Sequence, residues 1–308
     1  MEKIKIILDC DPGHDDAIAI ILASKHPNFE LLGITTESGN QTIEKTSKNA
    51  FNIAKYLNID VPIVKGATKP LEKEVEVCEA IHGESGLDGF TFPDYKFEFY
   101  PGTAANFIIN TCKKYQKVTI VTTGPMTNLA LALNEDPSIK EFIEEVVVMG
   151  GSIANGNVTP AAEFNILCDP EAADIVFRSG LKIKMCGLDV TRKVLVLPTI
   201  LEKAKQINTK SADLFVKLME VFNYNQKKVF GFEGAPLHDP VTLVSMIDEN
   251  VVTFKYVNVE IDVSKQCSYG RTNCDVSGYL KREPNAYVAV DINVEKYWDI
   301  ILKTLEIE

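Results

Sequence analysis

The sequence has little positive charge, a single tryptophan and no long apolar run. Its 308 residues include 32 Lys and Arg against 43 Asp and Glu, so the formal net charge at pH 7 is −11. A nucleic-acid-binding protein normally carries a basic face, and this balance argues against one. The longest apolar run, residues 17–23, is far shorter than the roughly 20 residues that a membrane-spanning helix needs. We therefore expect neither a nucleic acid nor a membrane among its partners.

The sequence also lacks the cysteine spacing of a disulfide framework or a zinc ribbon. Seven cysteines are scattered along the chain, and no Cys-x-x-Cys pair occurs among them. We expect reduced thiols, most of them packed against apolar side chains. The first residues, Met1-Glu2-Lys3-Ile4, do not fit a secretory signal peptide. We therefore expect a cytoplasmic protein.

Short β-rich runs alternate with helical segments through the first two thirds of the chain. The predicted strands are residues 4–8, 31–35, 61–64, 118–122, 146–149 and 182–185. The predicted helices between them are residues 15–26, 41–57, 103–115, 126–133 and 170–178. This alternation is typical of βαβ units. It predicts an α/β fold with an open, mostly parallel, Rossmann-like sheet and helices on both faces.

The last third of the chain has a different pattern, which predicts a mixed C-terminal extension. We expect helices at 211–228, after Asp239 and at 297–305, and strands at 252–263 and 286–291. Residues 66–101 form a long insert without clear periodicity. No stretch between Val118 and Asp239 has the Pro, Gly and Ser content of a linker, so we predict one domain, residues 1–308.

The strongest functional signal is a run of carboxylates directly after the first predicted strand. Residues 9–16, Asp-Cys-Asp-Pro-Gly-His-Asp-Asp, contain four aspartates and precede the first predicted helix. Ligands bind at this edge of open parallel sheets. Like charges this close must share protons or recruit a cation, and oxygen ligands favour Ca²⁺ or Mg²⁺ over zinc. Helix capping is the alternative, but capping requires one or two aspartates and not four.

Several motifs, in the right order, resemble those of the nucleoside hydrolases of the inosine–uridine preferring type. Residues 11–16 match the D-P-G-x-D-D signature of that family, and the resemblance covers nearly the whole chain. Further matches are Ile-Thr-Thr to Gly-Asn at 34–40, Gly-Pro-Met-Thr-Asn at 124–128, a glycine-rich stretch at 149–165 and Leu-His-Asp-Pro at 237–240. The resemblance implies hydrolysis of the N-glycosidic bond of a ribonucleoside to ribose and free base.

The resemblance also implies a metal centre and a mechanism. The carboxylates of Asp11, Asp16 and Asp239 and the backbone carbonyl of Thr123 would bind one Ca²⁺ per subunit. Asp11 would act as the general base on the water that attacks C1′ of the ribose, through an oxocarbenium-like transition state. His238 would help to protonate the leaving base, since the reference pKa of histidine lies near neutrality.

The remaining residues implied by the resemblance would hold the nucleoside. Amides and carboxylates suit a polyol because they hydrogen bond with hydroxyls, whereas loop geometry is the alternative explanation for the asparagines. The residues expected to hold the ribose hydroxyls are Asp15, Asn40, Asn157, Glu163 and Asn165, and Met149 and Phe164, in the matched stretch at 149–165, are expected to bind the substrate as well. His82, in a glycine-rich flap at 81–89, would contact the substrate as well.

Gln226 and Phe230 align with positions that read the base in pyrimidine-preferring relatives. The resemblance leads us to expect a tyrosine at position 230, where this chain has Phe230. Core packing is the alternative explanation for this side chain. The single tryptophan, Trp298, lies away from every matched motif, which argues against the tryptophan stacking of the purine-specific branch. We expect uridine and cytidine as substrates, inosine as a further candidate, a role in nucleobase salvage, and a homo-oligomer, either a tetramer or a dimer.

Two other interpretations are open at this point. Residues 6–11 also resemble the D-x-D strand end of haloacid-dehalogenase-type phosphatases, although Pro12-Gly13 after the second aspartate spoils the match. A non-catalytic protein that binds a nucleoside or sugar on the same fold needs no general base. A dinucleotide oxidoreductase is disfavoured because no G-x-G-x-x-G follows the first strand.

Overall fold

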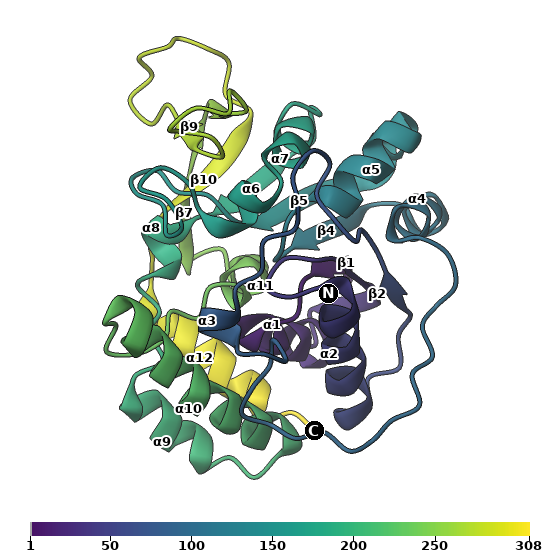
Figure 1. Cartoon of the computed structure of the whole chain (residues 1–308), viewed down its shortest axis with the longest axis vertical. Coiled ribbons are helices and arrows are strands. Elements are labelled where there is room, and N and C mark those ends of the chain that lie inside the picture. The colour runs from purple at the N-terminus through teal and green to yellow at the C-terminus, as the bar shows by residue number, and fades with distance from the viewer. Residues whose placement is uncertain (1) are drawn as a thin grey trace.

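An eight-stranded sheet lies between two layers of helices in the computed structural model, which describes residues 2–308 (Figure 1). The strand order is β3-β2-β1-β4-β5-β6-β10-β7, and every pairing is parallel except that of β10 with β7. The strands are β1 (Ile4–Cys10), β2 (Phe29–Thr36), β3 (Ile63–Lys65), β4 (Val118–Thr122), β5 (Ile143–Met149), β6 (Ile183–Cys186), β7 (Val252–Val257) and β10 (Ala286–Ile292).

Apolar side chains leave both faces of the central strands, because helices cover both faces of the sheet. Ile7 of β1 packs in one hydrophobic cluster together with residues of α4 (Ala104–Tyr115), α5 (Thr127–Glu135) and α7 (Pro170–Phe177). Leu8, the next residue along β1, packs in a second cluster on the opposite face. Continuous apolar strands are expected for a parallel sheet that is buried on both faces.

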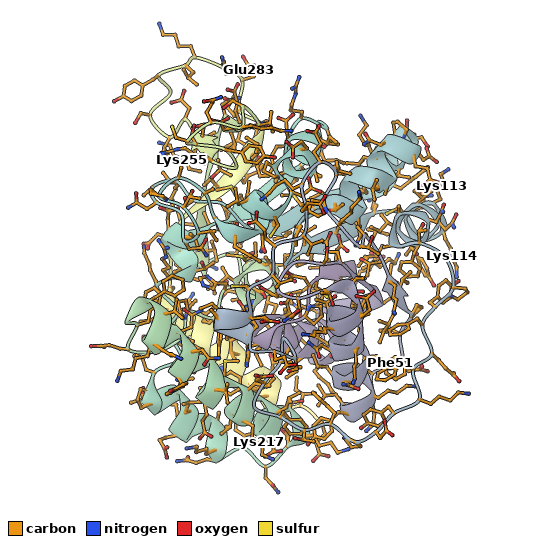
Figure 2. All side chains as sticks on the ribbon, in the orientation of Figure 1. Phe51, Lys113, Lys114, Lys217, Lys255 and Glu283 are labelled. Carbon is orange, nitrogen blue, oxygen red and sulfur yellow. The ribbon has the colours of Figure 1, made fainter. Side chains whose placement is uncertain are left out.

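The second cluster is built around α1 (His14–Lys25), whose residues Ala17 to Ala23 are all buried. Its neighbours in this layer are α2 (Ile43–Tyr56), α9 (Pro198–Lys205), α10 (Lys210–Phe230), α11 (Pro240–Ile247) and α12 (Val294–Leu305). In Figure 1 this layer lies below the sheet and the layer of α4, α5 and α7 lies above it. Charged side chains such as Lys113, Lys217 and Glu283 lie at the periphery (Figure 2).

Short elements complete the fold, and several of them carry residues of the site described below. They are α3 (Glu79–His82), α6 (Phe164–Cys168), α8 (Leu188–Thr191), the 3₁₀ helix η1 (Pro137–Phe142), and the antiparallel pair β8 (Val259–Ile261) and β9 (Thr272–Cys274). Within the insert at 66–101, α3 is the one regular element that the structure describes. No helix in the described part of the chain is both long enough and apolar enough to span a lipid bilayer.

The predicted α/β architecture is confirmed, and one predicted strand is wrong. The segment 252–263 is not continuous: it breaks at Asn258 into β7, which pairs with β10, and β8, which pairs with β9. The side-chain amide of Asn258 donates to the backbone carbonyl of Glu283, and the backbone carbonyl of Asn258 accepts the N–H of Asp275. These contacts to a distant loop redirect the chain. All seven cysteines are free, as expected.

We predict that Tyr297→Phe destabilises the fold. Tyr297 is fully buried, and its hydroxyl donates to the carbonyl of Leu237 over 3.0 Å. Removal of the donor leaves a buried carbonyl without this partner, which costs about 1–3 kcal/mol. The measurement is the free energy of unfolding in urea. The matched control is Tyr279→Phe, because Tyr279 is 85 % exposed and should change that free energy by less than about 0.5 kcal/mol. Equal losses in the two variants would contradict the argument.

Candidate active site

A cavity opens at the carboxyl ends of β1, β4 and β5. The strand order reverses at β1, where β2 lies on one side and β4 on the other, and such a point is the expected ligand site of a doubly wound sheet. The cavity brings together most of the residues that the sequence predicted for the site. These are Asp15, Asn40, His82, Thr123, Met149, Asn157, Glu163, Phe164, Asn165, Gln226, Phe230, His238 and Asp239.

Three buried carboxylates meet beside this cavity, which Asp15 and Asp239 line and which the predicted metal ligands Asp11 and Asp16 do not. Asp15 and Asp16 come from the first turn of α1, and Asp239 directly precedes α11. One carboxylate oxygen from each residue lies within 4.8 Å of the others. The sequence prediction grouped Asp11 with Asp16 and Asp239 and placed Asp15 with the ribose. In the structure Asp15 is part of the closest group.

Asp11 is fully buried and has one free oxygen. Its Oδ2 accepts the backbone N–H of Asn40 over 2.6 Å, whereas its Oδ1 has no hydrogen-bond partner in the described structure. Two glycines make room for this carboxylate. A Cβ at Gly39 would lie 2.1 Å from Oδ2, and a Cβ at Gly124 would lie 2.7 Å from Oδ1. Gly39 and Gly124, which lie in the matched motifs at 34–40 and 124–128, are therefore favoured at these positions for a steric reason.

Burial and mutual repulsion act strongly on these carboxyl groups. Burial, followed by the charge of Asp16, raises the pKa of Asp15 to about 8. Burial also raises the pKa of Asp16, and burial and neighbouring carboxylates raise those of Asp11 and Asp239 well above the ordinary value. A group with a raised pKa prefers its neutral form, and a positive charge nearby would favour the ionised carboxylates.

The donor set of this cluster fits a hard divalent cation. All side-chain donors are carboxylate oxygens, and the free Oδ1 of Asp11 is an orphaned buried acceptor. The carbonyl of Thr123 accepts from the Asn165 amide over 2.9 Å and keeps a second lone pair. The Thr123 hydroxyl donates to Asp16 over 2.7 Å and so fixes one of the carboxylates.

The loop at 149–165 forms one wall and is held by its own polar side chains. Glu163 caps α6: it accepts the N–H groups of Asn165 and Ile166, and also that of Gly151. The Asn165 amide donates to the carbonyls of Thr123 and Met149. These contacts satisfy much of the hydrogen-bonding capacity of Glu163 and Asn165 within the protein. Loop geometry, the alternative considered for the asparagines, does not explain Asn165, because this residue lies in the helix α6 and lines the cavity.

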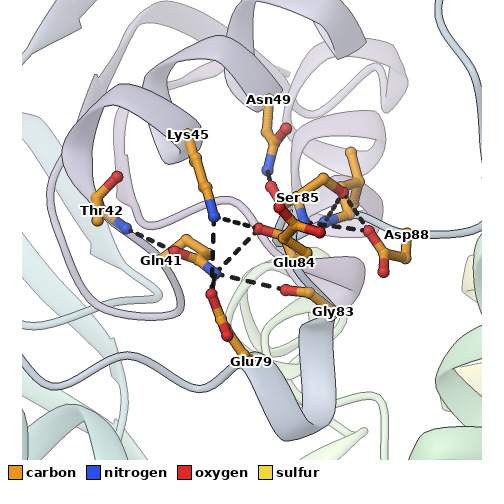
Figure 3. A network of polar contacts seen from close by, with 10 residues as sticks. Gln41, Thr42, Lys45, Asn49, Glu79, Gly83, Glu84, Ser85 and Asp88 are labelled. Carbon is orange, nitrogen blue, oxygen red and sulfur yellow. Dashed lines mark hydrogen bonds and ion pairs between the residues drawn. The ribbon is translucent and has the colours of Figure 1, made fainter.

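Residues at and just before the start of α2 hold the glycine-rich flap through hydrogen bonds (Figure 3). Gln41 donates to the carbonyl of Glu84 over 3.1 Å, and Lys45 donates to the same carbonyl. Asn49 uses its amide to join two segments, since it donates to the carbonyls of Ser85 and Pro12 over 3.0 Å each. The flap is thus tied to the loop that carries the carboxylates.

His82 of the flap is buried and lines the cavity. Its Nδ1 accepts the backbone N–H of His14 over 3.2 Å, so the neutral ring carries its proton on Nε2. His14, which the sequence left without a role, also contacts the carbonyl of Asp88 over 2.8 Å. Burial lowers the pKa of His82 well below its usual range.

His238 also lines the cavity, and its Nδ1 is 2.7 Å from the hydroxyl of Thr191. That contact leaves Nε2 for a ligand. Burial, followed by the positive charge of Arg192, lowers the pKa of His238 to about 3. The ring is therefore neutral near pH 7, so it offers a hydrogen bond and not the readily lost proton of an imidazolium.

One face of α10 forms a further part of the cavity wall. Phe222, Gln226 and Phe230 are four residues apart, so they share this face, and all three line the cavity. Core packing, the alternative for Phe230, is wrong because this side chain is 46 % exposed. Gln226 is buried, and its Oε1 has no partner in the described structure. Trp298 packs against Tyr297 in α12 and does not line the cavity, as expected.

Sequence reasoning missed several lining residues. The four-residue spacing along 222–230 could have identified Phe222, and Ile81 and Val158 lie within the flap and the matched stretch at 149–165, whereas the others lie on segments without a matched motif. The missed residues are Cys78, Ile81, Val158, Arg192, Phe222 and Phe232. Asp9, the nucleophile position of the phosphatase interpretation, is fully buried, accepts hydrogen bonds from Thr35 and Asn128 and, like Asp11, does not line the cavity.

Comparison with known proteins identifies the family. A family model described as inosine-uridine preferring nucleoside hydrolase matches residues 6–299. The pyrimidine-specific ribonucleoside hydrolase RihB of Escherichia coli is 40 % identical over 302 residues, which cover 98 % of this chain and 96 % of that protein. The chain belongs to the nucleoside hydrolase family.

Solved structures of nucleoside hydrolases share the fold. The purine-preferring ribonucleoside hydrolase from Gardnerella vaginalis matches with a TM-score of 0.92 at 35 % identity and covers 98 % of each chain. The plant nucleoside hydrolase PpNRh1 also has a TM-score of 0.92, at 29 % identity, and covers 98 % of this chain and 99 % of that one. The cavity described above therefore belongs to a hydrolase of ribonucleosides.

We predict that a divalent cation stabilises this nucleoside hydrolase through the carboxylate cluster. After chelation, CaCl₂ or MgCl₂ at a hundredfold excess over Kd should stabilise the fold by about 3 kcal/mol, because the ion binds the folded site alone. The measurement is thermal unfolding with and without each salt. Asp16→Asn should lose most of the stabilisation, whereas the control Asp60→Asn, at an exposed position, should retain it. An equal response in both variants would place the cation elsewhere.

Proposed function

We propose that this enzyme hydrolyses pyrimidine ribonucleosides, uridine and cytidine, to ribose and free base, with inosine as a further candidate. The observation that carries the proposal is the free Oδ1 of the buried Asp11 in the carboxylate cluster beside the cavity. The 40 % identity to a pyrimidine-specific relative over nearly both whole chains supports the choice of base.

We propose Ca²⁺ as the cation, one per subunit. Asp11, Asp16, Asp239 and the Thr123 carbonyl would hold it, and Asp15 lies close enough to contribute to the same site. An irregular set of carboxylates and a carbonyl suits Ca²⁺, whereas Mg²⁺ demands a tight octahedron. When bound, the ion supplies positive charge that lowers the pKa of a neighbouring water molecule and helps to orient ribose hydroxyls.

Asp11 is the proposed general base. The Asn40 N–H holds its Oδ2, which leaves Oδ1 to take the proton of the water that attacks C1′. The surrounding carboxylates favour the positive charge that develops on the sugar ring. Such a site should reject 2′-deoxynucleosides, because a missing hydroxyl leaves buried polar groups unpaired.

The other site residues have proposed roles in binding. Polar groups on the ribose side contact sugar hydroxyls, and those on the base side bind the nucleobase between aromatic rings. The ribose side comprises Asp15, Asn40, Met149, Asn157, Glu163 and Asn165, and the base side comprises His82, Phe164, Gln226, Phe230 and His238. The neutral ring of His238 donates a hydrogen bond from Nε2 to the departing base when the Thr191 hydroxyl donates a hydrogen bond to Nδ1.

We further propose that residues 1–308 act as a single domain, that the protein is a homo-oligomer, either a tetramer or a dimer, and that it works in the cytoplasm in nucleobase salvage. The family resemblance supports the proposed oligomer and the proposed role in the cytoplasm. Light scattering on the purified protein measures the number of subunits directly.

We predict that Asp11→Asn lowers the turnover of uridine by about 10²–10⁴-fold at saturating Ca²⁺, because the amide cannot accept the water proton. The measurement is ribose release from uridine and inosine, side by side, before and after chelation and Ca²⁺ restoration. Chelation should stop release from both nucleosides, and restoration should recover it.

The control is Asp299→Asn, an exposed carboxylate on α12, which should keep wild-type turnover. Near wild-type turnover of Asp11→Asn would refute the assigned base. No ribose from either nucleoside in the wild-type protein with Ca²⁺ would favour the non-catalytic binding protein instead.

A further inference from the structure

Arg192 is the one cationic Lys or Arg side chain among the described residues that line the active-site cavity. It is half-buried and directly follows Thr191, whose hydroxyl contacts His238. The remaining lining groups include the carboxylates of Asp15, Glu163 and Asp239. A cavity that is otherwise acidic therefore has a localised positive charge in one part of its wall.

The charge of Arg192 is fixed in place without being neutralised. The guanidinium donates to the carbonyl of Gly156 over 2.8 Å and to that of Asn155 over 3.4 Å. No carboxylate of the described residues forms an ion pair with it. Two neutral carbonyls therefore orient the planar group while it keeps its full positive charge and further N–H donors.

The charge of Arg192 acts on the pKa of two titratable side chains of the cavity. It lowers the pKa of His238, and it also acts to lower that of Glu163, which burial raises. His238 and Phe232 accompany Arg192 in the lining, and the hydroxyl of Thr191, the residue directly before Arg192, contacts Nδ1 of His238. Because the proposed arrangement of the substrate places the base beside His238, the cation lies near the space assigned to the base.

The proposed reaction creates negative charge in that space. The C1′–N1 bond breaks, and its electron pair stays on N1 of uracil, where it is delocalised onto O2 and O4. The oxygen of water bonds to C1′, and its proton goes to Asp11. The uracil anion takes a proton from solvent after departure. A fixed cation that faces this anion stabilises the transition state without any proton transfer.

We propose that Arg192 stabilises the anion of the departing base and so favours substrates whose base leaves as an anion. This inference rests on the proposed hydrolysis of nucleosides. It also bears on specificity, because a leaving purine can instead be protonated on its ring, and a nearby cation opposes that added positive charge. Arg192 therefore favours uridine over inosine.

The test compares leaving groups of different intrinsic stability in Arg192→Gln, Arg192→Lys and the wild type. The substrates are uridine, 5-fluorouridine and inosine, and the readout is kcat from ribose release. Arg192→Gln should lose about 10²-fold on uridine. It should lose less on 5-fluorouridine, whose base anion is more stable by itself, and less on inosine. Arg192→Lys keeps the charge, so its ratio of uridine to 5-fluorouridine turnover should stay near the wild-type ratio.

Arg192 also anchors the loop at 155–156, and the same experiment separates that structural role. Loss of loop anchoring would lower turnover of all three nucleosides by one common factor and would weaken inhibition by free ribose. That result, or unchanged turnover in Arg192→Gln, would overturn the inference. The control is Arg178→Gln, an exposed arginine paired with Asp174, which should match the wild type on every substrate.

A failure of the inference is distinguishable from a failure of the proposed function. If the wild type releases no ribose from uridine, the proposed function is wrong and the inference falls with it. If the wild type is active but the variants show no dependence on the leaving group, the inference alone is wrong. Urea unfolding of both Arg192 variants verifies that each is folded under the assay conditions.

Discussion

The repulsion among four buried carboxylates is the constraint on which the rest of this structure depends. Asp11, Asp15, Asp16 and Asp239 are all buried, and each has a raised pKa. Such a cluster is costly unless a cation or shared protons balance it. The surrounding groups reduce that cost. The Asn40 N–H, the Thr123 hydroxyl and the N-terminus of α1 all point the positive ends of their dipoles toward the carboxylates.

The sheet topology explains how residues so distant in sequence reach one point. Parallel strands all end at the same edge, so the loops after β1, β2, β4 and β5 converge there. Asp239 comes from the C-terminal third, where the chain packs α11 against α1. Gly39 and Gly124 complete the convergence, because a side chain at either position would occupy the space of the Asp11 carboxylate.

Groups of opposite charge at the cavity match the two fragments of a nucleoside. The carboxylate cluster suits a sugar ring that becomes positive as the glycosidic bond breaks. The lining also includes Arg192, two neutral histidines, His82 and His238, and the aromatic face of α10. The positive charge of Arg192 suits a base that becomes negative. Charge separation during the reaction is therefore aligned with charge separation already built into the protein.

The sequence by itself determined the α/β alternation, the carboxylate run at 9–16 and the family motifs, because these features are local and lie in contiguous residues. Tertiary structure decided the rest. Asp15 joined the carboxylate group, Arg192 entered the cavity, and the segment 252–263 divided at Asn258. Local pattern could not show these outcomes. Each depends on which distant backbone groups accept hydrogen bonds and which side chains share one buried volume, and chain packing alone sets both.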